Sequence, residues 1–341
     1  MPVIHFLNVN DGDCSFIEHI SGRITVIDVC NAKAASALGR SVERLNEVRA
    51  ALEEGVNGNF NQKEYPVNPI LYMQEHGLSK VFRFILTHPD MDHMDGIRAF
   101  FDAFSPLNFW DTDNEDEKDF GEGYNGGYNE EDWEFYKSLR DGKPETNPKR
   151  LTLYSGATGQ YYNKGETPDS GGDGLQVLAP TTQLVKDANE SGDYNDCSYV
   201  VLYRTGNYRI LFAGDSHDKT WEHILKEHEA RVTDVDLLIA PHHGRDSERD
   251  WEFLDVVNPA LTLFGNADSE HLAYGAWNYR GLPFITNNQA DCIMVDVGTD
   301  TMDVYVTCEA FAKASNPYTF RSDTFKGHYW GTIERRNGVG A

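Results

Sequence analysis

The chain has 341 residues, and its 55 acidic side chains against 30 basic ones give a formal net charge of −25. So acidic a protein repels extended polyanions, which argues against a free-standing, high-affinity DNA- or RNA-binding protein. No apolar run approaches the ~18 residues of a membrane helix, and the first residues read as a strand rather than a secretion signal, which predicts a soluble, cytoplasmic protein. The five cysteines are too widely separated to indicate a disulfide framework or a thiolate zinc site.

The first part of the chain predicts a meander of short strands. Alternating apolar residues predict strands over 3–9, 14–18 and 24–28, and the third of these ends on Asp28. A carboxylate at that position is either a helix cap or a site residue, and the pattern alone leaves both open. Helical spacing then predicts a helix over 41–54, inside an insertion at about 39–78.

Residues 87–96 form the motif that carries most of the chemical information, Thr-His-Pro-Asp-Met-Asp-His-Met-Asp-Gly. They lie between a predicted strand over 81–86 and a predicted helix over 97–104. A turn at the end of a strand can bring its side chains to one point, whereas a helix distributes them around its axis. The alternative is a solvated acidic loop. Imidazole and carboxylate together favour a divalent-metal site made by His88, Asp90, Asp92 and His93.

An insertion at about 111–150 separates the motif from the second half of the chain. Thirteen acidic residues fall between positions 111 and 145, and helical spacing predicts a helix over 130–140. The insertion is interpreted as a solvated acidic loop, as a lid that screens the site, or as a surface for a protein partner.

The second half repeats a unit of strand, polar tip and helix. Predicted strands over 208–215 and 235–241 end on Asp215 and on the pair His242-His243. Further strands are predicted over 175–180, 199–203, 261–264, 283–286, 292–297 and 302–306. Two sets of strands with helices between them predict an α/β fold, a sandwich of two mixed sheets flanked by helices. We expect one domain over residues 1–341, with the site where the polar tips meet.

The order of these motifs resembles the metallo-β-lactamase superfamily. The resemblance rests on Asp28, His88-x-Asp90-x-Asp92-His93, Gly214-Asp215 and His242-His243-Gly244. More narrowly, the chain looks like the branch of the hydrolase domain of the competence protein ComEC and of bacterial phosphorylcholine esterase. That branch is supported by the segments 8–13, 178–180, 195–198 and 240–244. The resemblance spans residues 3–310 and implies an αββα fold, one or two metal ions and a hydrolytic reaction.

The resemblance also implies roles for single residues. His88 and Asp90 would hold a first metal, Asp92 and His93 a second, and Asp215 would bridge both. His243 is the preferred last ligand of the second metal, with His242 as a hydrogen-bond donor to substrate. The lower-ranked candidates are Asp28, Asn195, Asp196, His217 and His271.

Two departures from the superfamily pattern concern the first metal. The commoner motif has a histidine at the position of Asp90, and the usual third histidine of that site is absent. Asn195 or Asp196 could take its place. Two divalent ions are implied, zinc first, with manganese plausible because Asp90 adds an oxygen ligand.

The implied reaction is hydrolysis by a metal-activated hydroxide, with Asp92 or Asp90 orienting the water and His242 stabilising or protonating the leaving oxygen. The first hypothesis is a phosphodiesterase, either a nuclease or an esterase of a small phosphoester, whose substrate is small or delivered by a partner. The second is a hydrolase of a carboxylic ester, thioester or lactone on the same metals. The third is a non-catalytic binding or regulatory module of this fold.

Overall fold

The computed structural model describes residues 1–33, 60–121, 126–142, 148–164, 172–247, 249–267 and 271–334. The helix expected over 41–54 lies outside these ranges. The rest of that insertion contains the short helix η2 (Gln62–Glu64) and the helix α2 (Pro69–Glu75), which begins with a proline after the capping side chain of Asn68. Within the described ranges, no helix is both long enough and apolar enough to cross a membrane.

The first sheet has ten strands in the order β15-β16-β14-β13-β1-β2-β3-β4-β5-β6, so both halves of the chain contribute to it. Strands β3 to β6 are parallel and the other pairs are antiparallel, which makes the sheet mixed. The strands are β1 (Val3–Phe6), β2 (Ser15–Glu18), β3 (Ile24–Ile27), β4 (Arg83–Ile85), β5 (Asn108–Trp110), β6 (Lys149–Leu151), β13 (Ile293–Val297), β14 (Thr301–Val306), β15 (Arg321–Ser322) and β16 (Gly327–Glu334).

The second sheet has six strands in the order β12-β11-β10-β9-β8-β7. Strands β9 to β12 are parallel, whereas β7, β8 and β9 pair antiparallel, so this sheet is mixed as well. The strands are β7 (Leu175–Ala179), β8 (Val200–Thr205), β9 (Tyr208–Phe212), β10 (Leu237–Ile239), β11 (Leu261–Phe264) and β12 (Phe284–Thr286).

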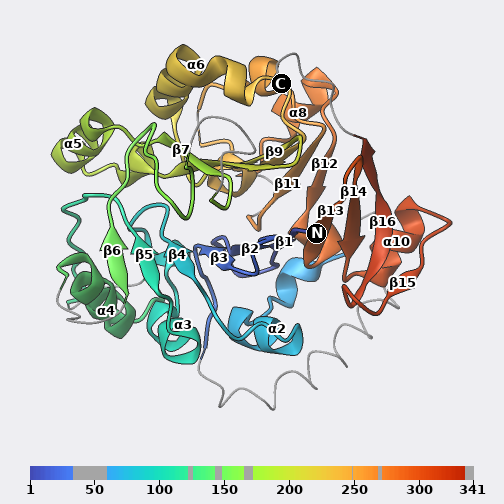
Figure 1. Ribbon diagram of the computed structural model, residues 1–341, viewed down its shortest axis with the longest axis horizontal. Helices are drawn as coiled ribbons and strands as arrows, with labels where there is room; N and C mark the ends of the chain where they lie inside the picture. The colour runs from blue at the N-terminus through green and yellow to red at the C-terminus, as the bar shows by residue number, and fades with distance from the viewer. Residues whose placement is uncertain are drawn as a thin grey trace.

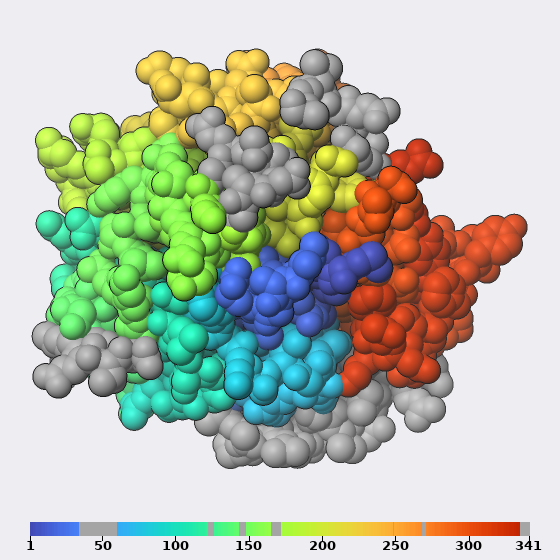
Figure 2. Space-filling view, viewed as in Figure 1, coloured from blue at the N-terminus to red at the C-terminus, as the bar shows by residue number. Residues whose placement is uncertain are grey.

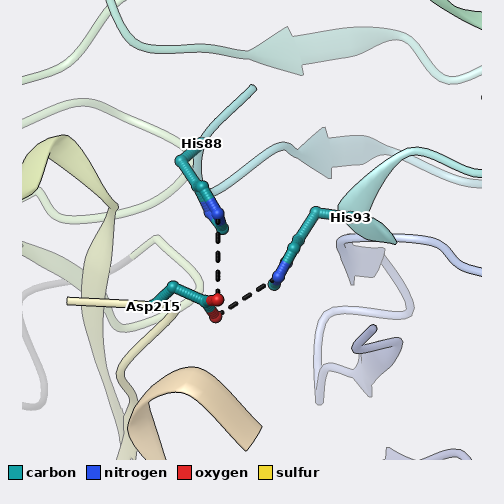
Figure 3. A group of neighbouring side chains, drawn as sticks. All are labelled: His88, His93 and Asp215. Carbon is teal, nitrogen blue, oxygen red and sulfur yellow. Dashed lines mark ion pairs between the residues drawn. The ribbon is translucent and has the colours of Figure 1, made fainter. Parts of the chain in front are cut away.

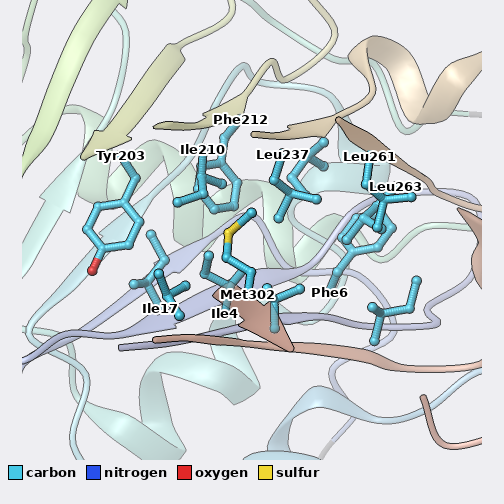
Figure 4. Packing of buried hydrophobic residues seen from close by; sticks show 14 of the residues in the cluster. Ile4, Phe6, Ile17, Tyr203, Ile210, Phe212, Leu237, Leu261, Leu263 and Met302 are labelled. Carbon is cyan, nitrogen blue, oxygen red and sulfur yellow. The ribbon is translucent and has the colours of Figure 1, made fainter. Parts of the chain in front are cut away.

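The two sheets pack face to face through one apolar core. Ile4, Phe6 and Ile17 of the first sheet lie opposite Ile210 and Leu263 of the second, and all five are buried (Figure 4). Burying this apolar surface is the main favourable term that holds the two sheets together.

Helices cover both outer faces (Figure 1). On the first sheet, Phe84 of β4 packs against Phe100 and Phe101 of α3 (Ile97–Phe104), beside α4 (Glu130–Arg140). The second sheet is covered by α6 (Asp218–Val232), α7 (Phe253–Val257) and α8 (Tyr274–Arg280). The remaining helices are η3 (Met91–His93), α5 (Thr182–Ser191), η4 (Tyr194–Cys197), η5 (Pro241–Gly244), α9 (Asn287–Ala290) and α10 (Glu309–Ser315). The expected sandwich of two mixed sheets flanked by helices is confirmed.

The parallel strands fix where polar side chains can meet. Ile27 and Ile85 are register partners at the ends of β3 and β4, as are Phe212 and Ile239 at the ends of β9 and β10. In sheets of this kind, functional residues gather beyond the carboxyl ends of the strands. The N-terminal segment reaches the surface between the segment after residue 60 and the second half of the chain (Figure 2).

A buried ion-pair cluster joins the first sheet to the segment before β7. Asp173 accepts hydrogen bonds from Nε and NH2 of Arg23, and its Oδ2 lies 2.7 Å from NH2 of Arg83. The side chains of Asp173 and Arg83 are 0% and 1% exposed. Burial pushes the pKa of Asp173 up, but the hydrogen bonds from Arg23 and the nearby positive charges outweigh it and lower this pKa to about 2.

We predict that Asp173→Asn lowers the free energy of unfolding by about 3 kcal/mol at pH 7, because it leaves two arginines without their anion. The unfolded-state pKa is ~3.9, so the ionised carboxylate stabilises the fold fully above that pH and loses this effect as pH falls toward 2. Denaturant unfolding of wild type and variant at pH 7, 4 and 2 should show the difference shrinking with acid. The exposed Asp300→Asn serves as control, and a difference that does not depend on pH would contradict the argument.

Candidate metal centre

Asp28 anchors the motif turn to the end of β3. Its buried carboxylate accepts hydrogen bonds from the backbone N and the Oγ1 of Thr87, both at 2.7 Å, and its Oδ2 lies 2.8 Å from Nδ1 of His93. These contacts make Asp28 an orienting residue for His93 rather than a helix cap. With Nδ1 held, the Nε2 of His93 points away from Asp28 into the centre.

Three buried side chains from two sheets point toward one another (Figure 3). His93 Nε2 lies 3.2 Å from Oδ1 of Asp215, and His88 Nε2 lies 3.9 Å from its Oδ2. Thr87 Oγ1, 3.0 Å from Nδ1 of His88, sets the orientation of that ring. One atom from each of the three side chains falls within a 4.8 Å group that could hold a metal ion.

His243 extends the cluster on the other side of Asp215. Its Nε2 lies 3.5 Å from Oδ2 of Asp92 and 3.6 Å from Oδ2 of Asp215, and its Nδ1 lies 3.0 Å from Oδ1 of Asp13. Asp92, His93 and His243 form a second ligand group, and Asp215 shares a third with Asp13 and His243. Asp215 therefore lies between two sets of donors, as a bridging ligand would.

Asp13 was not among the residues expected at the site. It follows β1 in the polar turn Asn10-Asp11-Gly12-Asp13, and a strand followed by such a turn is the same signal that marks Asp215. A Cβ on Gly12 would lie 1.8 Å from the backbone oxygen of Asp92, so this turn packs directly against the motif. Only glycine permits so close an approach.

Asp90 lies at the rim of the cluster, with 39% of its side chain exposed. Its Oδ2 is 3.4 Å from Nε2 of His88, and its Oδ1 is 3.0 Å from Nζ of Lys118. Burial pushes the pKa of Asp90 up, but the contacts with His88 and Lys118 outweigh it and hold this pKa well below its usual range.

His242 presents a defined hydrogen-bond donor to the centre. NH2 of Arg249 lies 2.9 Å from its Nδ1, and because a guanidinium can only donate, Nδ1 accepts. The proton of the neutral ring is then on Nε2, which lies 3.5 Å from Oδ2 of Asp215. Burial lowers the pKa of His242 to about 3. The charge of Asp215 raises this pKa, but those of His243 and Arg249 lower it further. The ring is therefore neutral near pH 7.

The backbone around this histidine pair is strained. His242 and His243 have φ of 51° and 57°, in the left-handed region that side chains with a Cβ rarely adopt, and Asp28 has φ of 56°. Residues in such conformations persist only where the surrounding packing imposes them, and they concentrate at functional sites.

The lower-ranked candidates lie around the cluster and outside its ligand groups. Asn195 and Asp196 belong to η4, where the carboxylate of Asp196 lies 3.3 Å from Nζ of Lys219. His217 precedes α6, and its ring centroid is 5.8 Å from that of His242. His271 is exposed, and its backbone oxygen accepts a hydrogen bond from the N of Asp246. Among the described residues, none of these four belongs to a ligand group with Asp215.

The donor set fits a divalent metal. The buried Nε2 atoms of His88, His93 and His243, and Oδ1 of Asp215, make no hydrogen bond within the described residues. Buried polar atoms in native proteins are almost always satisfied, so four that converge without a hydrogen bond fit a site for a cation. Imidazole nitrogens with carboxylate oxygens are ligands that zinc takes.

The charges in the centre are strongly coupled. Burial opposes ionisation of Asp215, but His93, His243 and the other rings outweigh it and hold its pKa well below the usual range. For His93, burial lowers the pKa, but the charges of Asp215, Asp28 and Asp92 outweigh burial and raise this pKa well above its usual value. For His243, Asp13 and Asp215 outweigh burial and raise the pKa to about 10.

Comparisons with known proteins give structural similarities only. No protein-family pattern and no curated protein sequence matches the chain. Tm1679, a metal-dependent hydrolase of the β-lactamase superfamily, aligns with a TM-score of 0.48 and 11% identity over 87% of this chain and 100% of its own. The metallo-β-lactamase fold protein YhfI from Bacillus subtilis aligns with a TM-score of 0.44 and 10% identity, over 86% of this chain and 100% of its own. Zn²⁺-bound PqqB from Methylobacterium extorquens aligns with a TM-score of 0.43 and 12% identity, over 87% of this chain and 100% of its own.

Metal binding should release protons. At pH 7 the rings of His93 and His243 are protonated in the metal-free protein, and a metal binds only the neutral imidazole. Titration calorimetry in buffers of different ionisation enthalpy should count about two protons released per filled centre at pH 7. The affinity should rise with pH from 6 toward 9, and binding without proton release would contradict this.

Gly12→Ala should damage the centre from outside the ligand set. The added Cβ would lie 1.8 Å from the backbone oxygen of Asp92, so the turn or the motif must shift. We expect zinc affinity to fall by ~10-fold or more, measured against a chromophoric chelator. Gly275→Ala in α8, where a Cβ meets nothing within 4 Å, is the matched control and should bind zinc as wild type does. Equal affinities for the two variants would contradict the assignment.

Proposed function

We propose that this chain is a metal-dependent hydrolase that cleaves a phosphodiester at the centre around Asp215. The observation that carries the proposal is the convergence of buried imidazole Nε2 atoms and a carboxylate oxygen that make no hydrogen bond among the described residues. Such a set is costly to fold unless a cation completes it.

The proposed assignment keeps the roles implied by the motif. Asp90 belongs to none of the three groups of side chains, but its Oδ2 lies 3.4 Å from Nε2 of His88. His88 and Asp90 would hold one ion, and Asp92, His93 and His243 the other. Asp215, with one oxygen 3.2 Å from His93 and the other 3.6 Å from His243, would contact both. When bound, a divalent ion lowers the pKa of coordinated water from ~15.7 toward ~7 and draws charge from a phosphoryl or carbonyl oxygen.

The protein side chains supply orientation and hydrogen bonding. The carboxylates of Asp92 and Asp90 are 26% and 39% exposed, so solvent reaches them and they would accept hydrogen bonds from an attacking water. His242 would donate its Nε2 proton as a hydrogen bond to the oxygen on which charge develops. Because its pKa is lowered to about 3, His242 serves as a neutral donor, and the role of an imidazolium acid is disfavoured.

An anionic substrate is favoured by the cations at this edge. Lys118 lies against Asp90 and Arg249 lies against His242, so two cations stand beside the centre of a chain whose formal net charge is −25. The overall charge repels a long polyanion, so we favour a small phosphodiester, or a nucleic acid that a partner delivers.

A second candidate is hydrolysis of an ester, thioester or lactone. It is supported by the neutral His242 donor, since a developing carbonyl oxyanion requires the same kind of hydrogen bond. A panel of a chromogenic phosphodiester, a chromogenic acetate ester and a γ-lactone, assayed with zinc or manganese, would separate the two activities. Metal binding without turnover of any of the three would favour a binding or regulatory module.

Asp215→Asn should abolish most phosphodiester hydrolysis. The amide removes the charge shared by both sets of ligands, and we expect the rate to fall by about 100-fold or more, with loss of bound metal. Asp300→Asn, on the exposed turn between β13 and β14, is the control for the same chemical change and should hydrolyse at the wild-type rate. Undiminished activity and metal content in Asp215→Asn would place the reaction elsewhere.

A further inference from the structure

Lys118 connects the acidic insertion directly to Asp90 at the rim of the ligand cluster. We define the acidic segment as residues 111–121 and 126–142. The Nζ of Lys118 lies 3.0 Å from Oδ1 of Asp90 and 2.8 Å from Oδ2 of Asp116, and it sits 5.5 Å from the ring centroid of Trp133. Only 22% of the side chain is exposed. Two ion pairs and an aromatic ring therefore hold the ammonium group of Lys118 in a defined position, unlike that of a mobile surface lysine.

The acidic segment is docked on the motif through a second contact. Asp132 of α4 accepts hydrogen bonds from the backbone N of Gly96 at 3.0 Å and of Arg98 at 3.1 Å. Those two N–H groups begin α3, whose own N-cap residue is a glycine without a capping side chain. The next residue, Trp133, is 1% exposed and supports Lys118. The segment therefore positions Lys118 relative to the turn that carries Asp90.

Lys118 divides the two oxygens of Asp90 between different partners. Oδ1 is taken by the ammonium group, whereas Oδ2 faces Nε2 of His88 at 3.4 Å. One oxygen is thus directed toward the ligand position that His88 shares, and the other is held away from it. Lys118 also places a positive charge beside the carboxylate of Asp90, a charge that it shares with Asp116.

From this geometry we propose that Lys118 is a positioning residue that makes the first metal position prefer zinc over manganese. A carboxylate limited to one oxygen favours a small coordination number, which suits tetrahedral zinc. A carboxylate free to give both oxygens, with an extra negative charge, suits the larger, oxygen-rich shell of manganese. The proposal rests on the metal centre of the proposed function and assigns its metal selection to a contact made by the acidic segment.

The test compares Lys118→Met with Lys118→Arg by chelator competition with Zn²⁺ and Mn²⁺ separately. The methionine keeps the apolar stem against Trp133 but loses the charge, and the arginine keeps the charge. We expect the ratio of manganese to zinc dissociation constants to fall by about tenfold in Lys118→Met and to stay within about twofold of wild type in Lys118→Arg. Cobalt substitution gives an independent reading, because the visible absorption of Co²⁺ weakens as its coordination number rises above four. Lys118→Met should show that weakening and Lys118→Arg should not.

The outcomes separate the two proposals. If the wild-type protein binds neither ion, the metal centre itself is wrong. If wild type binds both ions and Lys118→Met leaves the ratio and the cobalt spectrum unchanged, the role of Lys118 is wrong and the centre stands. Lys118→Gln, which also removes the positive charge beside Asp90 but keeps a polar end, should move the ratio in the same direction by a smaller factor. This second variant decides the question if Lys118→Met fails to fold, and an unchanged ratio in it would then overturn the proposal.

Discussion

The burial of Asp215 is the constraint on which the candidate site depends. Its carboxylate is 2% exposed, and four imidazole rings approach it, with Nε2 atoms 3.2 to 3.9 Å from its oxygens. An unpaired carboxylate in such a place costs several kcal/mol, so the rings must be held where they are. They come from the ends of β4 and β10, on different sheets, and the packing of the two sheets against each other brings them together.

Holding the rings in place requires strain in the backbone, and burial of the neighbouring strands in the core compensates for that strain. Asp28, His242 and His243 each adopt a left-handed conformation that costs of order 1–3 kcal/mol. The strands that precede them, β3 and β10, are fully buried, and Phe264 packs where a Cβ on Gly244 would lie. Apolar burial in the strands therefore offsets the strain in the turns that follow them.

The sequence allows the layer order and the residues of the central cluster to be predicted, because both depend on local patterns. A strand followed by a polar tip is readable in one stretch of chain, and it locates Asp28, His88, His93, Asp215 and His243. The residues that sequence reasoning missed act across long separations: Asp13 contacts His243, Lys118 contacts Asp90, and Arg249 fixes His242. No periodicity encodes these pairs, since each depends on how loops from different elements dock.

Contacts around the centre show how some of the chain's many acidic residues are used. A chain with 25 more acidic than basic residues would be expected to surround a cation site with negative charge. Two cations also lie beside the cluster, Lys118 against Asp90 and Arg249 against His242, and the carboxylate of Asp132 accepts backbone hydrogen bonds at the start of α3. Acidic residues of the insertion thus serve partly as fixed hydrogen-bond acceptors that support the motif. The field at the centre is therefore set by the charged side chains in contact with it, more than by the net charge, because charges at contact distance outweigh distant ones that salt screens.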